Sequence, residues 1–105
     1  MENITAQEAQ KIIENGKARV IDVRTPAEFA DGHIPGAKNV NFYEANFSEL
    51  VKEFPLGEVY VVNCQSGGRS AKACAIMEEL GFVGALNLEG GITAWKSAGL
   101  PVEGY

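Results

Sequence analysis

The apolar run at residues 58–63, EVYVVN, constrains the fold of this chain more than any other stretch. Its four central residues, VYVV, lack the alternation of apolar and polar residues that marks a strand with one face in water. Helices cover both faces of a parallel sheet, so the inner strands of such a sheet are apolar throughout. The run therefore predicts a buried strand of a parallel sheet.

Strand-like and helix-like patterns alternate along the rest of the chain. Short apolar or β-branched stretches predict strands at residues 19–23, 37–40 and 85–88. Apolar residues at helical spacing predict helices at residues 44–53, 70–80 and 91–97. A capping box of Thr5 and Glu8 opens a further helix that ends at Asn15-Gly16, and residues 27–30 allow one helical turn. This alternation predicts an α/β fold with a central parallel sheet of about five short strands, flanked by helices on both faces.

The length and charge of the chain limit its domain organisation and its partners. With 105 residues, 46% of them hydrophobic, we expect a single domain that spans residues 1–105. The formal net charge of −5 argues against nucleic acid or an anionic membrane as a partner, because phosphate binding needs a concentrated excess of Lys and Arg. An anionic ligand would need a local pocket instead.

Targeting signals and cysteine content bear on the location of the protein. The first ten residues, MENITAQEAQ, have neither the basic nor the apolar region of a signal peptide. No segment approaches the roughly 20 apolar residues that span a bilayer. Two cysteines, Cys64 and Cys74, are too few for the disulfide framework of a small secreted domain. We therefore expect free thiols and a cytoplasmic protein.

Cys64 follows the buried strand and opens the loop CQSGGRS, which leads into a predicted helix. At such a position a thiol lies beside several backbone N–H groups and the positive end of the helix dipole, which favour its thiolate. Gly67 and Gly68 let consecutive amides turn toward one anion, and Arg69 adds a positive charge. Because these surroundings lower a thiol pKa, the loop predicts a reactive cysteine that binds an anion.

Two other roles have to be weighed for Cys64. A free cysteine after a strand is often a buried packing residue, but packing alone does not require the two glycines, the arginine and the helix start. A zinc site needs four ligands, and two cysteines with a single histidine, His33, make no close ligand pair. A thiolate in an anion-binding loop suits two chemistries, sulfur transfer through a cysteine persulfide and phosphoryl transfer through a phosphocysteine.

The loop CQSGGRS resembles the active-site loop of the single-domain rhodaneses, in which a cysteine, two residues, a glycine, one residue and an arginine follow one another. Two further stretches carry the resemblance. IDVRTPAEFADGHIPGAKNV, at residues 21–40, is similar to the amino-terminal signature of that family, and LEGGITAWKSAGLPV, at residues 88–102, is similar to its carboxyl-terminal signature. The match covers almost the whole chain, in the order of the family.

The resemblance implies a single rhodanese-like domain that acts as a thiosulfate sulfurtransferase. Cys64 would take the outer sulfur of thiosulfate, a polysulfide or a persulfide and hold it as a persulfide of its own. A thiol, cyanide or a protein of a sulfur relay would then accept the sulfur. The persulfide would be stabilised by the Arg69 side chain and by the backbone amides of Gln65, Ser66, Gly67, Gly68 and Ser70. This chemistry needs no metal or organic cofactor.

Two alternatives on the same scaffold stay open. The first is a phosphatase of the Cdc25 type or an arsenate reductase. Such phosphatases have five residues between cysteine and arginine, whereas four residues separate Cys64 from Arg69, and Ser70 stands where a phosphatase needs arginine. The second is a non-catalytic interaction module, although a binding domain has no physical need for an activated thiol.

Five further residues invite a functional interpretation. Asp22 and Arg24 follow the end of a strand and are expected to form an ion pair and turn contacts. Arg24 is the one of the two that we include among the candidate substrate-binding residues. The single histidine, His33, lies in the turn GHIPG and is expected to form a hydrogen bond there. Cys74 and Trp95 lie on the apolar faces of predicted helices and are expected in the core.

Overall fold

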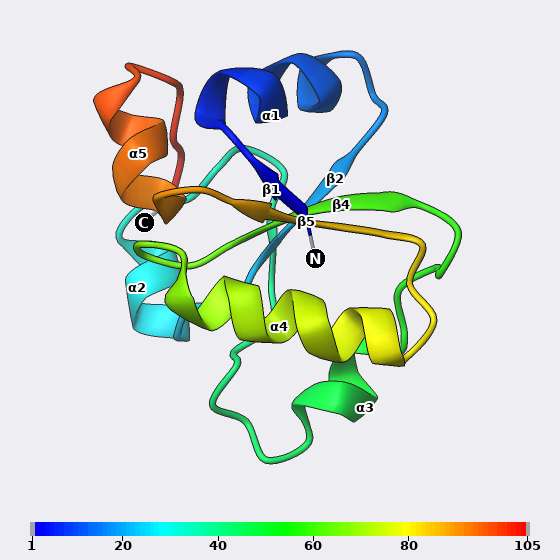
Figure 1. The fold of residues 1–105 in the computed structure, drawn as a ribbon. Helices are drawn as coiled ribbons and strands as arrows, with labels where there is room; N and C mark the ends of the chain where they lie inside the picture. Colours follow the sequence, from blue (N-terminus) through cyan, green and yellow to red (C-terminus); the bar gives the residue numbers. More distant parts are fainter. Residues whose placement is uncertain (1, 105) are drawn as a thin grey trace.

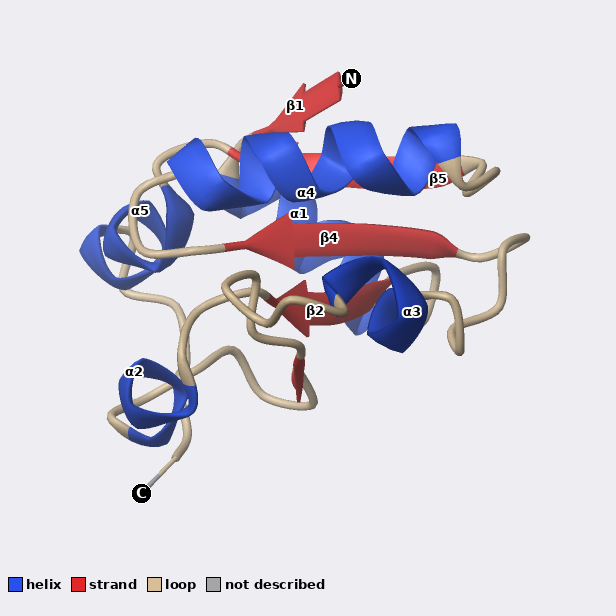
Figure 2. Cartoon of the chain, turned by 90° about the horizontal axis from the view of Figure 1, so that it is seen from below, coloured by secondary structure: helices blue, strands red, loops and turns tan. Residues whose placement is uncertain are grey.

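The computed structural model describes residues 2–104, and its centre is a sheet of five parallel strands. Across the sheet the order is β1 (Glu2–Ile4), β5 (Gly84–Leu88), β4 (Val59–Asn63), β2 (Arg19–Asp22) and β3 (Lys38–Asn39). The apolar run of residues 58–63 supplies β4, the middle strand, and Figure 2 shows β5, β4 and β2 side by side. The predicted α/β class with a parallel sheet is confirmed.

Helices cover both faces of this sheet (Figure 1). On one face lie α1 (Ala6–Glu14) and α5 (Gly91–Ser97), and on the other lie α3 (Phe47–Val51) and α4 (Gly68–Glu79). The short α2 (Pro26–Ala30) follows the end of β2 and lies at the carboxyl edge of the sheet. The carboxyl ends of β2 and β4 therefore meet α2, α4 and α5 at one edge.

Each face of the sheet has its own apolar core, and β4 contributes to both. Val61 packs in the cluster under α1 and α5, whereas Tyr60 and Val62 pack in the cluster under α3 and α4. All three side chains are 0% exposed. Burial on both faces is what the absence of alternation in the VYVV run predicts.

Two elements differ from the sequence prediction. The sequence does not predict β1, because three residues that include Glu2 and Asn3 are too few and too polar to show a strand pattern, yet they pair with β5. The helix expected at residues 44–53 shrinks to α3, since turns occupy both of its flanks. The other elements lie close to their predicted bounds, and the capping box of Thr5 and Glu8 opens α1 as expected. Within residues 2–104 no helix is long and apolar enough to cross a membrane.

Candidate active site

The loop that begins at Cys64 lies at the carboxyl edge of the sheet, between the end of β4 and the start of α4. Gly67 is the residue before the helix and has a φ of +114°, a left-handed conformation that side chains other than glycine rarely adopt. This conformation turns the Gly67 N–H back toward the cysteine, at 3.0 Å from Cys64 Sγ. The glycine predicted to curl the loop therefore has a defined role in it.

The sulfur of Cys64 is surrounded by hydrogen-bond donors. The residue is 2% exposed, and its Sγ accepts from the Gly67 N–H and lies 3.3 Å from Ser70 Oγ. Burial raises the pKa of the thiol, but hydrogen bonds from the Ser70 hydroxyl and from the amides of Ser70, Gly67 and Ser66 lower it further than burial raises it. The net pKa of Cys64 is below its ordinary value, so the thiolate is favoured.

Ser70 connects the sulfur to a chain of polar side chains that runs from the buried Asn87 to the exposed Asn3. Its hydroxyl has one proton and lies within reach of three acceptors, Cys64 Sγ, Gly67 O at 3.2 Å and Asn87 Oδ1 at 2.6 Å. Asn87, on β5, donates in turn to Asn3 Oδ1 at 3.0 Å. Sequence reasoning missed Asn87, although an asparagine within the apolar strand GALNL was a signal for it.

The Arg69 side chain is bound to a carboxylate. Its two terminal nitrogens donate to the two carboxylate oxygens of Glu28, at 2.8 and 3.0 Å, and its guanidinium lies 5.4 Å from the centre of the Tyr43 ring. Glu28 sits on α2, where it also accepts from Thr25 N and Thr25 Oγ1 in a capping box. Arg69 therefore ties the cysteine loop to α2, a contact that the sequence did not predict.

Arg24 lies beside the loop and is also paired. Asp22 stands opposite Asn63 in the β2–β4 register, which brings Arg24 next to the end of β4. Arg24 Nη2 donates to Asp22 Oδ2 and to Gly32 O, each at 2.8 Å, and Arg24 Nη1 is 3.5 Å from Gln65 Oε1. The expected ion pair is present, and its arginine touches the loop through Gln65.

The start of α5 holds the loop from the opposite side. Ile92 N donates to Cys64 O at 2.9 Å, and Thr93 N donates to Gln65 O at 3.2 Å. The approach is so close that a Cβ on Gly91 would lie 2.5 Å from Gln65 O and 2.6 Å from Cys64 O. Gly91 is thus a functional position that the analysis of single residues missed, and its signal was the glycine pair at residues 90 and 91.

The other residues singled out in the sequence lie outside this loop. His33 Nδ1 is 2.9 Å from Phe29 O, and the His33 ring stacks on that of Phe29, so the histidine belongs to its turn. Cys74 and Trp95 are buried in the two cores, as expected. Burial, the largest cause, raises the pKa of Cys74 to about 12, so this thiol stays protonated. Within residues 2–104 no group of three His, Cys, Asp or Glu side chains could hold a metal ion.

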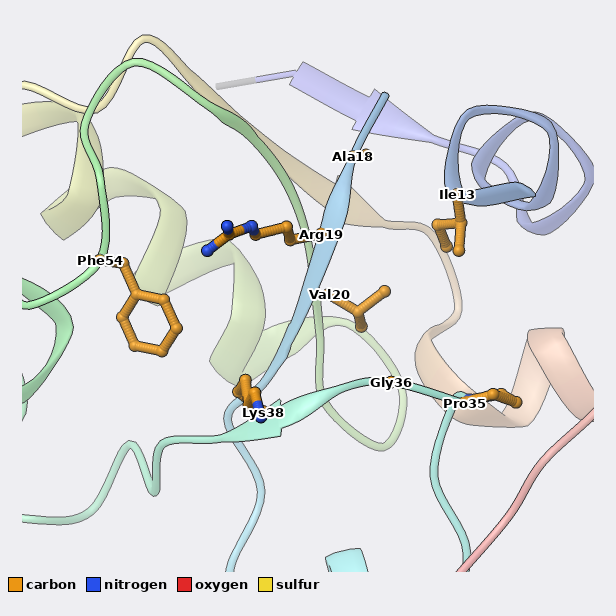
Figure 3. Close-up of a pocket in the computed structure, with 8 residues that line it drawn as sticks. All are labelled: Ile13, Ala18, Arg19, Val20, Pro35, Gly36, Lys38 and Phe54. Carbon is orange, nitrogen blue, oxygen red and sulfur yellow. The ribbon is translucent and has the colours of Figure 1, made fainter. Parts of the chain in front are cut away.

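A hollow of about 430 Å³ lies at the amino end of β2, the opposite edge of the sheet from Cys64 (Figure 3). It is lined by apolar side chains and by two cations, among them Ile13, Val20, Phe54, Arg19 and Lys38. None of the residues from Cys64 to Ser70 lines it, so it is no part of the candidate active site.

The fold and the loop together define a class of protein, a small α/β domain with an activated thiol at the carboxyl edge of its sheet. The family model described as Rhodanese-like domain matches residues 5–98. A sulfurtransferase of Allochromatium vinosum is 37% identical over 94 residues, which cover 90% of this chain and 86% of that protein. The chain belongs to the rhodanese-like domain family.

Two further relatives agree with this assignment. Thiosulfate sulfurtransferase 16 of the Arabidopsis thaliana chloroplast is 39% identical, over 81% of this chain and 79% of that protein. The crystal structure of a rhodanese-related protein from Thermoplasma volcanium superposes with a TM-score of 0.88 at 32% identity and covers 98% of both chains. Membership in this family, with sulfurtransferases among the relatives, supports sulfur transfer between a donor and an acceptor.

Proposed function

We propose that this protein is a thiosulfate sulfurtransferase that carries a sulfane sulfur as a persulfide on Cys64. The donor is thiosulfate or a similar compound, and the acceptor is cyanide in an assay, a thiol, or a protein of a sulfur relay. The observation that carries the proposal is the Cys64 sulfur, which accepts a hydrogen bond from Gly67 N at 3.0 Å in a loop that lowers the pKa of its thiol.

The reaction has two displacement steps. In the first, the Cys64 thiolate attacks the outer sulfur of thiosulfate. A new S–S bond forms, the old S–S bond breaks, and sulfite leaves with the electron pair. In the second, cyanide or a thiolate attacks the outer sulfur of the Cys64 persulfide, and the thiolate of Cys64 is regenerated. Because sulfite leaves as a stable anion, the first step needs no general acid.

The loop stabilises the negative charge that stays on sulfur through both steps. We assign this role to the backbone amides at Gln65, Ser66, Gly67, Gly68 and Ser70, together with the positive end of α4. Arg69 and Arg24 are the candidate cations of the site, with Arg24 at its rim beside Gln65. Two free cysteines and a thiolate mechanism suit a reducing compartment, and we place the protein in the cytoplasm.

Intact-protein mass spectrometry after incubation with thiosulfate, and then with cyanide, tests this proposal. We expect wild type to gain one sulfur atom that cyanide removes. Cys64→Ser should never gain it, and Cys74→Ala should gain it as wild type does. If thiosulfate, polysulfide and a hydropersulfide all leave the protein unchanged, the proposal is wrong. Hydrolysis of an aryl phosphate that disappears in Cys64→Ser would then favour a phosphatase, and no reaction of either kind would favour an interaction module.

A further inference from the structure

The charges around the cysteine loop indicate which class of sulfur donor the site prefers. This inference rests on the proposed function. We infer that the preferred sulfur donor is the hydropersulfide of a thiol, R–S–SH or its monoanion, and not the dianion thiosulfate. The inference rests on the pairing of both arginines of the site, Arg69 and Arg24, with carboxylates. A site without an unmatched cation has little to offset the second charge of a dianion.

The pair of Arg69 and Glu28 is held on both sides. Both terminal nitrogens of Arg69 donate to Glu28, so the guanidinium cannot present its fork to a donor without breaking this pair. Glu28 cannot easily turn away, because Oε1 also accepts from Thr25 N at 3.0 Å and from Thr25 Oγ1 at 3.1 Å. The hydrogen bond from Arg69, the largest cause, lowers the pKa of Glu28 to about 2, so this carboxylate is charged at every working pH.

The pair of Arg24 and Asp22 is buried and equally fixed. Arg24 is 2% exposed and Asp22 is 0% exposed. Arg24 Nε lies 3.1 Å from both carboxylate oxygens of Asp22, and Arg24 Nη2 donates to Asp22 Oδ2 and to Gly32 O. The nitrogen that remains, Nη1, faces Gln65 Oε1 at 3.5 Å. The positive charge of Arg24 is therefore also matched by a carboxylate.

The first residue of the loop after the cysteine adds no charge. Gln65 is exposed, and its Nε2 donates to Thr93 Oγ1 at 3.1 Å, a further contact between the loop and α5. Two further cations lie on the neighbouring helices, Lys72 on α4 and Lys96 on α5, and both are exposed, where water and salt screen their fields. The two ion pairs carry no net charge, so among residues 2–104 the groups nearest the sulfur that can offset a donor's charge are the backbone N–H groups and the Ser70 hydroxyl.

The two donors differ in the negative charge that they bring to the loop. Thiosulfate brings two negative charges to a site that already holds a thiolate, and it leaves sulfite, again a dianion, beside the anionic persulfide. With a hydropersulfide, the Cys64 thiolate forms a bond to the outer sulfur, and the S–S bond of R–S–SH breaks. The outer proton moves to the departing sulfur, so R–SH leaves and Cys64 holds a persulfide anion. One negative charge is present before and after this step, or two where the monoanion reacts and R–S⁻ leaves, against three with thiosulfate.

Steady-state kinetics with cyanide as the acceptor test the inference. The value of kcat/KM is measured with thiosulfate and with the hydropersulfide of 2-mercaptoethanol, whose carrier is uncharged, and the Cys64→Ser rate is subtracted as the uncatalysed background. For wild type we expect the hydropersulfide value to exceed the thiosulfate value by at least about tenfold, the effect of one extra charge roughly 6 Å away at an effective dielectric of about 40. A higher value for thiosulfate in wild type would overturn the inference.

Gln65→Arg gives a second test, because it places an unmatched cation at the rim. We expect it to raise the ratio of the thiosulfate value to the hydropersulfide value by about tenfold. Gln65→Met, which removes the amide without adding charge, should leave this ratio within about threefold of wild type. An unchanged ratio in Gln65→Arg would also count against the inference. If neither donor loads sulfur on Cys64, the proposed function itself fails.

Discussion

At the scale of single residues, the two cysteines show how surroundings decide the chemistry of a side chain. Both are buried, at 2% exposure for Cys64 and 0% for Cys74. Burial raises the pKa of both thiols, yet the pKa of Cys64 is lowered overall because backbone and hydroxyl donors surround its sulfur. Cys74 has no such compensation, and its pKa rises to about 12. The sequence predicts this difference in pKa, because it places Cys64 in a glycine loop and Cys74 on the apolar face of a helix.

Ser70→Ala should make Cys64 less reactive at neutral pH. The substitution removes the hydroxyl that lies 3.3 Å from Sγ, so the thiol pKa should rise and the thiolate fraction should fall. We expect alkylation of Cys64 by iodoacetamide at pH 7 to slow roughly five- to tenfold, the value of about one hydrogen bond. Peptide mapping reports the rate at Cys64, and Ser97→Ala on α5 is the control. An unchanged rate would show that the amides alone set the thiol pKa.

At the scale of elements, two segments far from the loop in sequence, α2 and α5, hold it in place. The Arg69–Glu28 pair joins α4 to α2, and the hydrogen bonds from Ile92 and Thr93 join α5 to the loop. The cysteine loop itself spans only the step from β4 to α4. Its geometry therefore depends on contacts whose strength can be measured one at a time.

Glu28→Gln should reduce stability in a pH-dependent way. The folded pKa of Glu28 is about 2 and the unfolded value about 4.5, so the charged group stabilises the fold above pH 4.5 and this gain is lost as pH falls toward 2. The Glu28 side chain is a third exposed, so we expect about 1 kcal/mol at pH 7. Urea unfolding of both proteins at several pH values measures it. A difference that persists unchanged at pH 2.5 would contradict the assignment.

The matched control for Glu28→Gln is Glu49→Gln. Glu49 also pairs with a cation, Lys52, at 3.2 Å, but its side chain is 70% exposed on α3. Because water screens such a pair, this substitution should change stability by less than about 0.5 kcal/mol at any pH. The comparison separates the effect of the half-buried contact with Arg69 from that of losing a charge.

Gly91→Ala should displace the cysteine loop. A Cβ at residue 91 would overlap the Cys64 and Gln65 carbonyl oxygens, whereas a Cβ at Gly99 would meet no atom within 4 Å. Both glycines have left-handed φ values, +58° and +73°, so Gly99→Ala carries the backbone strain without the overlap. We expect Gly91→Ala to cost at least about 2 kcal/mol more than Gly99→Ala in urea unfolding. It should also lose sulfur loading by mass spectrometry, while equal behaviour of the two variants would contradict the loop contact.

The elements that the sequence predicted well are those with a local signal. The capping box of Thr5 and Glu8, the VYVV run and the glycine loop are each decided by neighbours in sequence. The pairing of β1 with β5 joins residues 2 and 86, and the Arg69–Glu28 pair joins residues 41 positions apart. No local pattern encodes such contacts, because they depend on where the whole fold places each side chain.

At the scale of the whole molecule, the middle strand links two cores. Adjacent residues of β4, Val61 and Val62, point to opposite faces of the sheet and join different apolar clusters. The sheet therefore forms one side of each core, and the cysteine loop directly follows its middle strand, β4. Damage to either core should lower the stability of the same folded unit.

Val61→Ala and Val62→Ala should therefore destabilise the protein by similar amounts. Both side chains are 0% exposed, so each substitution leaves a small cavity and should cost about 2 kcal/mol in urea unfolding. Val83→Ala, at a residue that is 75% exposed, is the control and should change stability by less than about 0.5 kcal/mol. A sheet with one face in water would make only one of the two β4 substitutions costly. Equal losses at both positions, with a single unfolding transition, would show that the two cores fold together and support the loop that carries Cys64.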